Sequence, residues 1–262
     1  LVNRAYHDNP RKFVDGLYRI GSAEDLKNPI PGYMKPRIRR PGEGAYWSAT
    51  TLPWMSIGYE TQITPINTLN FYNGIANNGR MVRPRIVKAI LRNGEVVKEF
   101  PVEVLREHMA KDEAVRDVQK CLRNVTTVGV GKPAASKLFP VAGKTGTAQI
   151  WTGGGKTSEY FITFAGYFPY DKPLYSCIVC IRKPAPASGG GMCGPVFRKV
   201  AESVMARNHV NDYTAARDTT HEHSTVCLNG NMTVTTRLFD MVGLPTNGEF
   251  ANNGQTVWGS VH

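Results

Sequence analysis

Apolar residues recur at helical spacing in three stretches of the chain. The first, residues 64–79, opens with Thr64-Pro65, which suits a cap and the first helical position, and closes with Asn78-Gly79, which suits a left-handed stop. The same spacing predicts helices over 111–125 and 194–207. The residues predicted to face a core are Ile66, Leu69, Tyr72, Ile75 and Ala76 in the first helix, Val115, Val118, Leu122 and Val125 in the second, and Val196, Phe197, Val200, Ala201, Val204 and Met205 in the third.

Three strand candidates lie between the second and third helices, at residues 139–151, 159–168 and 174–183. The last two flank the sequence PYDKP, a five-residue connection rich in turn formers. Both are nearly continuous in apolar residues, which predicts that both faces of their sheet are covered. We therefore expect an α+β fold with an antiparallel sheet flanked by helices, the first strand at its edge and the last helix packed across it.

Glycine and proline gather in residues 152–159 and 183–194, which are either mobile rims of a site or ordinary surface loops. After Arg207 the composition shifts to threonine, asparagine, glycine and histidine, with one short helix candidate at 234–242. The sequence thus predicts a main unit over 1–207 and a linker or incomplete accessory segment over 208–262.

The chain carries a net charge of +11, but its basic residues are scattered and only residues 35–40 (KPRIRR) are dense. No zinc finger, helix-turn-helix or RNP-like motif accompanies them, so a solvated basic face that attracts an anionic substrate or envelope is favoured over nucleic-acid binding. No apolar run reaches the roughly 20 residues that span a bilayer.

The five cysteines are an odd number, which does not suit a disulfide framework. Cys177 and Cys180 lie on a predicted strand with an odd separation, so their side chains point to opposite faces and form neither a redox pair nor a metal clip. His221, His223 and Cys227 are the alternative metal ligands, but no well-spaced fourth ligand follows. We expect no metal and no cofactor.

The first predicted strand carries the run Lys-Thr-Gly-Thr at residues 144–147. A lysine ammonium beside two hydroxyls can hold a carboxylate, and a glycine lets a substrate backbone lie against the strand edge. An amide N–H at the end of the run can donate to a developing oxyanion. These are the needs of an enzyme that recognises a free C-terminal carboxylate and attacks the neighbouring carbonyl.

In motif, order and spacing, the chain resembles the transpeptidase domain of class B penicillin-binding proteins. The resemblance rests on AGKTGTAQ at 142–149, on the Thr-Pro-led helix and return at 58–87, on the strand pair at 164–184 and on GPVFRKVAE at 194–202. It covers roughly residues 1–206 and implies part of the penicillin-binding protein/β-lactamase-like fold. The form SIGYE before the Thr-Pro pair favours the division-associated type.

The resemblance implies a peptidoglycan D,D-transpeptidase that cross-links stem peptides by serine acyl transfer and is captured covalently by penicillin and other β-lactams. It implies a parent protein anchored in the cytoplasmic membrane, working on its extracytoplasmic (periplasmic) face within a cell-wall synthesis complex. Lys144 matches the lysine that polarises the catalytic network, and Thr145 and Thr147 match the hydroxyls that hold the carboxylate. The N–H of Thr147 would be an oxyanion donor, and Gly146 would keep the edge open. Gln149 and Trp151 would shape acceptor access, unless Trp151 is structural.

The family's nucleophile is a serine followed three residues later by lysine, and none of the ten serines here has lysine at that position. The motif Ser-x-Asn is also absent. We therefore expect residues 1–207 to be the C-terminal part of a transpeptidase domain, with the nucleophile upstream of Leu1 and no activity in this chain alone. The alternatives are a β-lactamase or β-lactam sensor, a catalytically inactive scaffold module, and a nucleic-acid binder.

Overall fold

The computed structural model describes residues 1–43, 46–152 and 155–208. The chain divides into two compact units, Leu1–Asn208 and His209–His262. The second unit lies outside the described residues, as do the predicted helix at 234–242 and the alternative metal ligands His221, His223 and Cys227. The division predicted after Arg207 therefore stays a prediction.

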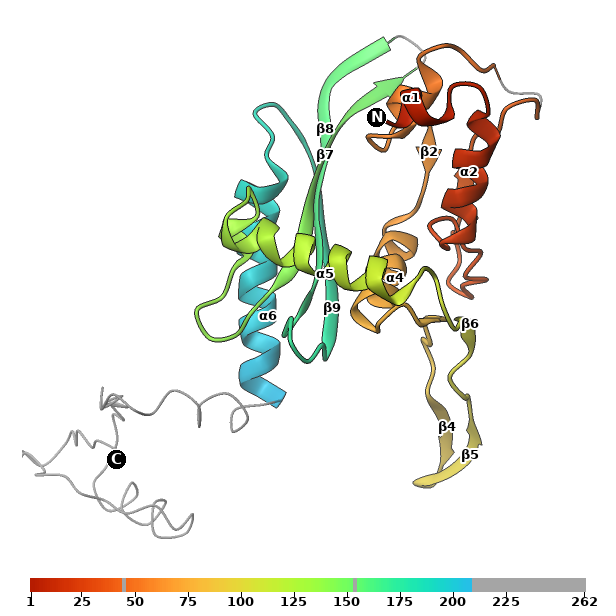
Figure 1. The fold of residues 1–262 in the computed structure, drawn as a ribbon. Helices are drawn as coiled ribbons and strands as arrows, with labels where there is room; N and C mark the ends of the chain where they lie inside the picture. Colours follow the sequence, from red (N-terminus) through yellow and green to blue (C-terminus); the bar gives the residue numbers. More distant parts are fainter. Residues whose placement is uncertain (44–45, 153–154, 209–262) are drawn as a thin grey trace, which may run out of the picture. The chain divides into compact units, whose positions relative to one another are not determined.

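An antiparallel sheet of three strands organises the first unit (Figure 1), with the order β7 (Ala142–Thr152), β8 (Gly155–Phe168) and β9 (Tyr175–Pro184). Strand β7 pairs only with β8 within the described residues, so the Lys-Thr-Gly-Thr run lies on an edge strand as predicted. Most of the segment expected as a mobile loop at 152–159 instead continues the two strands, with Trp151 opposite Lys156. Alternating polar and small residues are compatible with an exposed strand end. The prediction of a loop was based on the many glycines in this segment and overlooked that alternation.

The first predicted helix is α4 (Pro65–Ala76), and both of its predicted ends are confirmed. The hydroxyl of Thr64 accepts a hydrogen bond from the N–H of Asn67 at 3.4 Å. Asn78 and Gly79 have φ angles of 54° and 89°, the left-handed conformation that ends the helix. The second helix is α5 (Asp112–Thr127), and both helices pack against one end of the sheet through a cluster that includes Ala142 and Tyr167.

Helix α6 (Gly194–Asn208) packs across the opposite face of the sheet. Phe197 meets Phe164 and Phe168 of β8, with ring centroids 4.7 and 5.7 Å apart. We predicted that both residues of each adjacent apolar pair in this helix would face the core. This is wrong for Val196 and Val200, which are 43% and 41% exposed. Consecutive helix residues point about 100° apart, so a flat sheet buries only one stripe, here Phe197, Ala201 and Met205. For the same reason Val118 of α5 lies on the flank of its helix and is exposed.

The sheet register confirms that Cys177 and Cys180 point to opposite faces, since they pair with Gly166 and Thr163. Within the residues that the structure describes, no group of three or more potential metal-binding side chains occurs. None of the described helices is long and apolar enough to span a bilayer.

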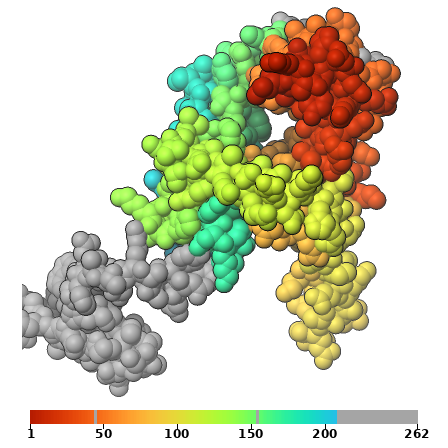
Figure 2. Space-filling view, viewed as in Figure 1, coloured from red at the N-terminus to blue at the C-terminus, as the bar shows by residue number. Residues whose placement is uncertain are grey.

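The N-terminal segment adds short elements that lie beside the sheet: α1 (Val2–Tyr6), α2 (Pro10–Arg19), β1 (Arg37–Ile38), α3 (Thr51–Met55) and β2 (Thr61–Gln62). They share a small core of Val14, Ala23, Ile38 and Met55. Strands β1 and β2 pair with each other, which places Arg37 opposite Gln62. Figure 2 shows the surface hollowed where the red and orange N-terminal segments meet the green strands.

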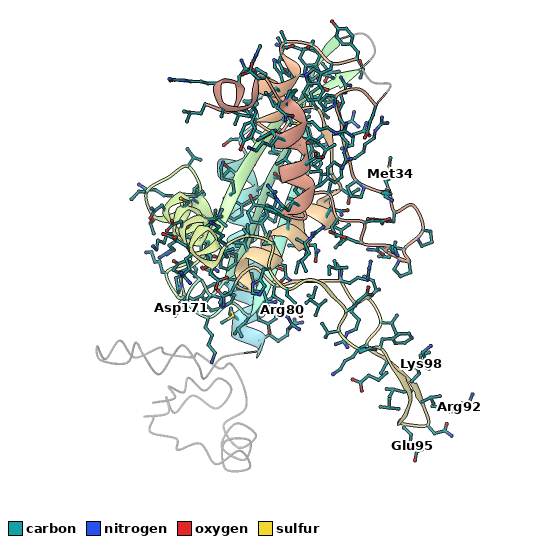
Figure 3. The ribbon with its side chains drawn as sticks, turned by 45° about the vertical axis from the view of Figure 1, so that its right-hand side comes forward. Met34, Arg80, Arg92, Glu95, Lys98 and Asp171 are labelled. Atoms are coloured by element: carbon teal, nitrogen blue, oxygen red, sulfur yellow. The ribbon has the colours of Figure 1, made fainter. Side chains whose placement is uncertain are left out.

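A hairpin that we did not predict, β4 (Ala89–Arg92) and β5 (Glu95–Glu99), extends from the body on the paired strands β3 (Met81–Val82) and β6 (Val104–Arg106) (Figure 1). The labelled side chains Arg92, Glu95 and Lys98 point away from the rest of the molecule (Figure 3). The sequence did contain a hairpin signal: Asn93-Gly94 has Leu91 and Val96 two positions away on either side, and both turn residues have positive φ.

Candidate functional site

The Lys-Thr-Gly-Thr run lies in the middle of β7 and faces solvent along one edge of the backbone. The N–H of Gln149 donates to the hydroxyl of Tyr59 at 3.2 Å, so it points away from β8. Inward and outward N–H groups alternate along an edge strand, so the N–H of Thr147 points to the same free edge. An outward N–H beside an exposed hydroxyl is the geometry that an oxyanion or carboxylate site needs.

The hydroxyl of Thr147 is held by the segment that follows β9. Its oxygen accepts a hydrogen bond from the N–H of Gly189 at 3.2 Å. Because the oxygen is engaged as an acceptor, the hydroxyl hydrogen is oriented away and remains available to a ligand. Thr147 is exposed, so nothing in the described structure covers this donor.

Lys144 is exposed, and its ammonium folds back onto the next residue. The Nζ atom donates to the carbonyl oxygen of Thr145 at 2.9 Å and to its hydroxyl at 3.2 Å. No carboxylate among the described residues pairs with Lys144. The strand therefore presents one uncompensated cation and two hydroxyls, a set that attracts a carboxylate.

Gly146 lies in close contact with a neighbouring strand of the sheet. This contact was not predicted from the sequence. A Cβ at this position would lie 2.3 Å from the hydroxyl oxygen of Thr163 on β8. The residue is therefore small because its neighbour on the sheet face needs the space, and not only because a substrate needs an open edge.

The glycine-rich segment at 183–194, for which the composition left a mobile rim and an ordinary surface loop as alternatives, is packed in part against the sheet. Its second half forms a π-helical turn, η2 (Gly189–Cys193), which packs against β7 with Gly189 and Gly190 buried. A Cβ on Gly189 would lie 2.4 Å from the carbonyl oxygen of Gly146, and one on Gly190 would lie 2.2 Å from that of Val130. The glycines bring one backbone against another and so brace the strand that carries the site.

Gln149 and Trp151 lie at the far end of β7, in an aromatic cluster. The ring centroids of Trp151 and Trp54 are 5.6 Å apart, and those of Trp54 and Tyr59 are 5.1 Å apart. The side chain of Gln149 donates to the carbonyl of Thr157 at 2.8 Å. Trp54 and Tyr59 were not singled out from the sequence, because no local pattern links them to a strand ninety residues away.

Two adjoining hollows flank the strand. The first, of about 270 Å³, is lined by residues that include Gly146, Thr147, Ala148 and Cys180. The second, of about 480 Å³, lies further along β7. It is lined by Arg37, Arg39, Gly58, Tyr59, Glu60, Thr61, Gln62, Ala148, Gln149 and Trp151. The two hollows have Gly58, Thr61 and Ala148 in common, so they adjoin beside the run, and we call them together the groove.

The chain matches known proteins in both sequence and overall fold. Residues 9–202 match the family model described as the penicillin binding protein transpeptidase domain. The chain belongs to this family. The class B assignment made from the motifs is supported by relatives named PbpB and FtsI.

Among its relatives, the transpeptidase-family chain is 29% identical over 218 residues to the penicillin-binding protein PbpB of Mycolicibacterium smegmatis and 30% identical to PbpB of Mycobacterium tuberculosis. Each alignment covers 77% of this chain and 32% and 31% of the relative, so the chain spans about a third of their length. The structure of penicillin binding protein 3 from Mycobacterium tuberculosis with aztreonam superposes with a TM-score of 0.67 at 28% identity, over 77% of this chain and 47% of that one. These matches confirm the predicted fold.

Proposed function

We propose that this chain supplies the carboxylate-binding strand of a peptidoglycan D,D-transpeptidase, which cross-links stem peptides by serine acyl transfer and is acylated by β-lactams. The observation that carries the proposal is the exposed Lys144 beside Thr145 and Thr147 on a free strand edge. Family membership supports it, as do relatives named peptidoglycan D,D-transpeptidase. The solved relative in complex with aztreonam supports the β-lactam part.

In this proposal the substrate's C-terminal carboxylate lies against the hydroxyls of Thr145 and Thr147, and the ammonium of Lys144 supplies the opposite charge. The outward N–H of Thr147 donates to the carbonyl oxygen that becomes negative in the tetrahedral intermediate. Gly146 and η2 hold the strand in place without covering its edge. Gln149 and Trp151 border the groove by which the peptide or acceptor reaches the strand.

A nucleophile must complete such a site, and no serine among the 262 residues has a lysine at the third following position. We propose that the serine and its lysine are contributed by residues outside this sequence. We further propose that the parent protein is anchored in the cytoplasmic membrane and acts on its extracytoplasmic (periplasmic) face. There it would belong to a complex that synthesises the cell wall during division.

Labelling by a fluorescent penicillin tests the proposal, with residues 1–262 compared with a longer protein that includes the preceding Ser-x-x-Lys. Acylation needs a positioned nucleophile and a base, so we expect a labelled band on a denaturing gel from the longer protein only. In the longer protein, Lys144→Ala should slow acylation by at least about a hundredfold, since one aligned charge or donor is worth that much in acyl transfer. Lys172→Ala, an exposed lysine in the connection between β8 and β9, is the matched control.

Three outcomes contradict the proposal in different ways. A folded longer protein that never labels favours the inactive scaffold module. Rapid release of the bound label favours a β-lactamase. Equal acylation rates for Lys144→Ala and Lys172→Ala exclude the strand from the chemistry.

A further inference from the structure

The larger hollow beside β7 is lined by positively charged side chains, and the acidic side chains among the described residues neutralise only some of them. Arg39 is neutralised, because its Nη1 lies 3.0 Å from Oε2 of Glu60. Arg37 lines the same hollow and is exposed, and no acidic side chain within the described ranges pairs with it. Lys156 adds a second cation at the rim, with its Nζ 5.3 Å from the ring centroid of Trp151. The hollow is therefore net positive and has an aromatic wall.

The edge of β7 is open after the Lys-Thr-Gly-Thr run, towards this hollow, and is covered before the run. Before the run, the carbonyl of Val141 is bound by the hydroxyl of Thr126 at 2.6 Å and by Arg123 at 3.1 Å. Helix α5 thus closes that end. An extended ligand anchored at Thr147 can run only towards Trp151.

The strand also determines where the ligand leaves the edge. With the carbonyl of the penultimate residue at the N–H of Thr147, the third residue from the C-terminus lies one extended residue further on, roughly 3.3 Å away and opposite Ala148. Ala148 lines both hollows. One position beyond it, the hydroxyl of Tyr59 already occupies the outward N–H of Gln149, so the ligand backbone finds no strand partner there and its third side chain lies beside the hollow.

We propose that this hollow is a specificity subsite that selects an anionic side chain on the third residue from the substrate's C-terminus, with Arg37 as its recognition residue and Trp151 as its wall. The inference rests on the proposed function, because it places the substrate's C-terminal carboxylate at Thr145 and Thr147. Arg37 is a binding residue and takes no part in the acyl transfer.

Four peptides test the subsite on the 262-residue chain. They are N-acetylated tripeptides that end in D-Ala-D-Ala, with glutamate or glutamine as the third residue from the C-terminus, and each is made as the C-terminal acid and amide. Tryptophan fluorescence follows binding, since Trp151 lines the hollow and Trp54 contacts its ring. With the C-terminal acid, the glutamyl peptide should bind about fivefold more tightly than the glutaminyl peptide, as expected for one exposed ion pair.

Arg37→Gln should abolish this preference, and Arg37→Lys should retain most of it. Arg92→Gln makes the same substitution on the exposed hairpin, outside the hollow, and should leave the preference unchanged. A preference that survives Arg37→Gln, or a glutaminyl peptide that binds as tightly as the glutamyl one, overturns the subsite. Equal binding of the C-terminal acids and amides is a separate result, which contradicts the carboxylate-binding strand of the proposed function instead.

Discussion

Adding a single methyl group to Gly189 tests whether η2 braces the site strand. In Gly189→Ala, the new Cβ would lie 2.4 Å from the carbonyl oxygen of Gly146 and 2.7 Å from that of Thr163. Both atoms belong to backbone in the centre of the sheet, so neither can rotate away. We expect the turn to move outward and the hydrogen bond from the Gly189 N–H to the Thr147 hydroxyl to break.

The expected cost has two parts. Overpacking a well-filled interior costs about 1–3 kcal/mol, and a lost hydrogen bond costs about 1 kcal/mol. The free energy of unfolding should therefore fall by about 2–4 kcal/mol. For a unit of this size, that corresponds to a decrease in Tm of about 5–15 °C.

Gly191→Ala is the matched control in the same turn. The nearest heavy atom to its Cβ would be the hydroxyl oxygen of Ser188 at 3.1 Å, on a side chain that can shift. Neither glycine has a positive φ, so backbone strain does not separate the two variants. Urea unfolding followed by far-UV circular dichroism should show Gly191→Ala within about 1 kcal/mol of the unaltered chain. If Gly189→Ala is equally well tolerated, the turn does not brace the strand.

Three further measurements test other features. Phe197→Ala should lower the free energy of unfolding by about 3–5 kcal/mol, whereas Val196→Ala should cost less than about 1 kcal/mol; equal losses in urea unfolding would contradict the single buried stripe of α6. Cys121 is exposed, but Cys193 is fully buried and burial raises the pKa of its thiol, so mass spectrometry after brief alkylation at neutral pH should find Cys121 modified first. A hydrogen bond from Arg83 lowers the pKa of Glu103 below 4.5, so its stabilisation is present at neutral pH and is lost as the pH falls through that lowered value. Melting temperatures of Glu103→Gln and the unaltered chain should differ at pH 7 and converge in acid; a constant difference would contradict the ion pair.

Local signals in the chain were sufficient for the elements around the site. Thr64-Pro65 and Asn78-Gly79 place both ends of α4, because capping and left-handed stops depend on neighbouring residues only. The continuous apolar runs of β8 and β9 and the short connection between them predicted the meander, and a meander with short connections leaves its first strand at the edge. The Lys-Thr-Gly-Thr run could therefore be assigned to an edge strand before any contact was known. The residue types of that run, a lysine and two threonines, were sufficient to predict that the strand binds the carboxylate of a ligand.

Contacts between distant segments were decided by the tertiary structure. The choice between Val196 and Phe197 depends on how flat the opposing sheet is, which no periodicity records. Residues 189–190 read as a flexible loop, because glycine permits both mobility and the closest backbone packing, and only the neighbouring strand distinguishes these uses. Tyr59 reaches Gln149 across ninety positions, and Arg37 reaches the same groove from still further away. The sequence by itself determined which strand carries the Lys-Thr-Gly-Thr run and that this strand lies at the edge of the sheet. Only the fold decided what surrounds the run, because side chains that meet in space need share no pattern along the chain.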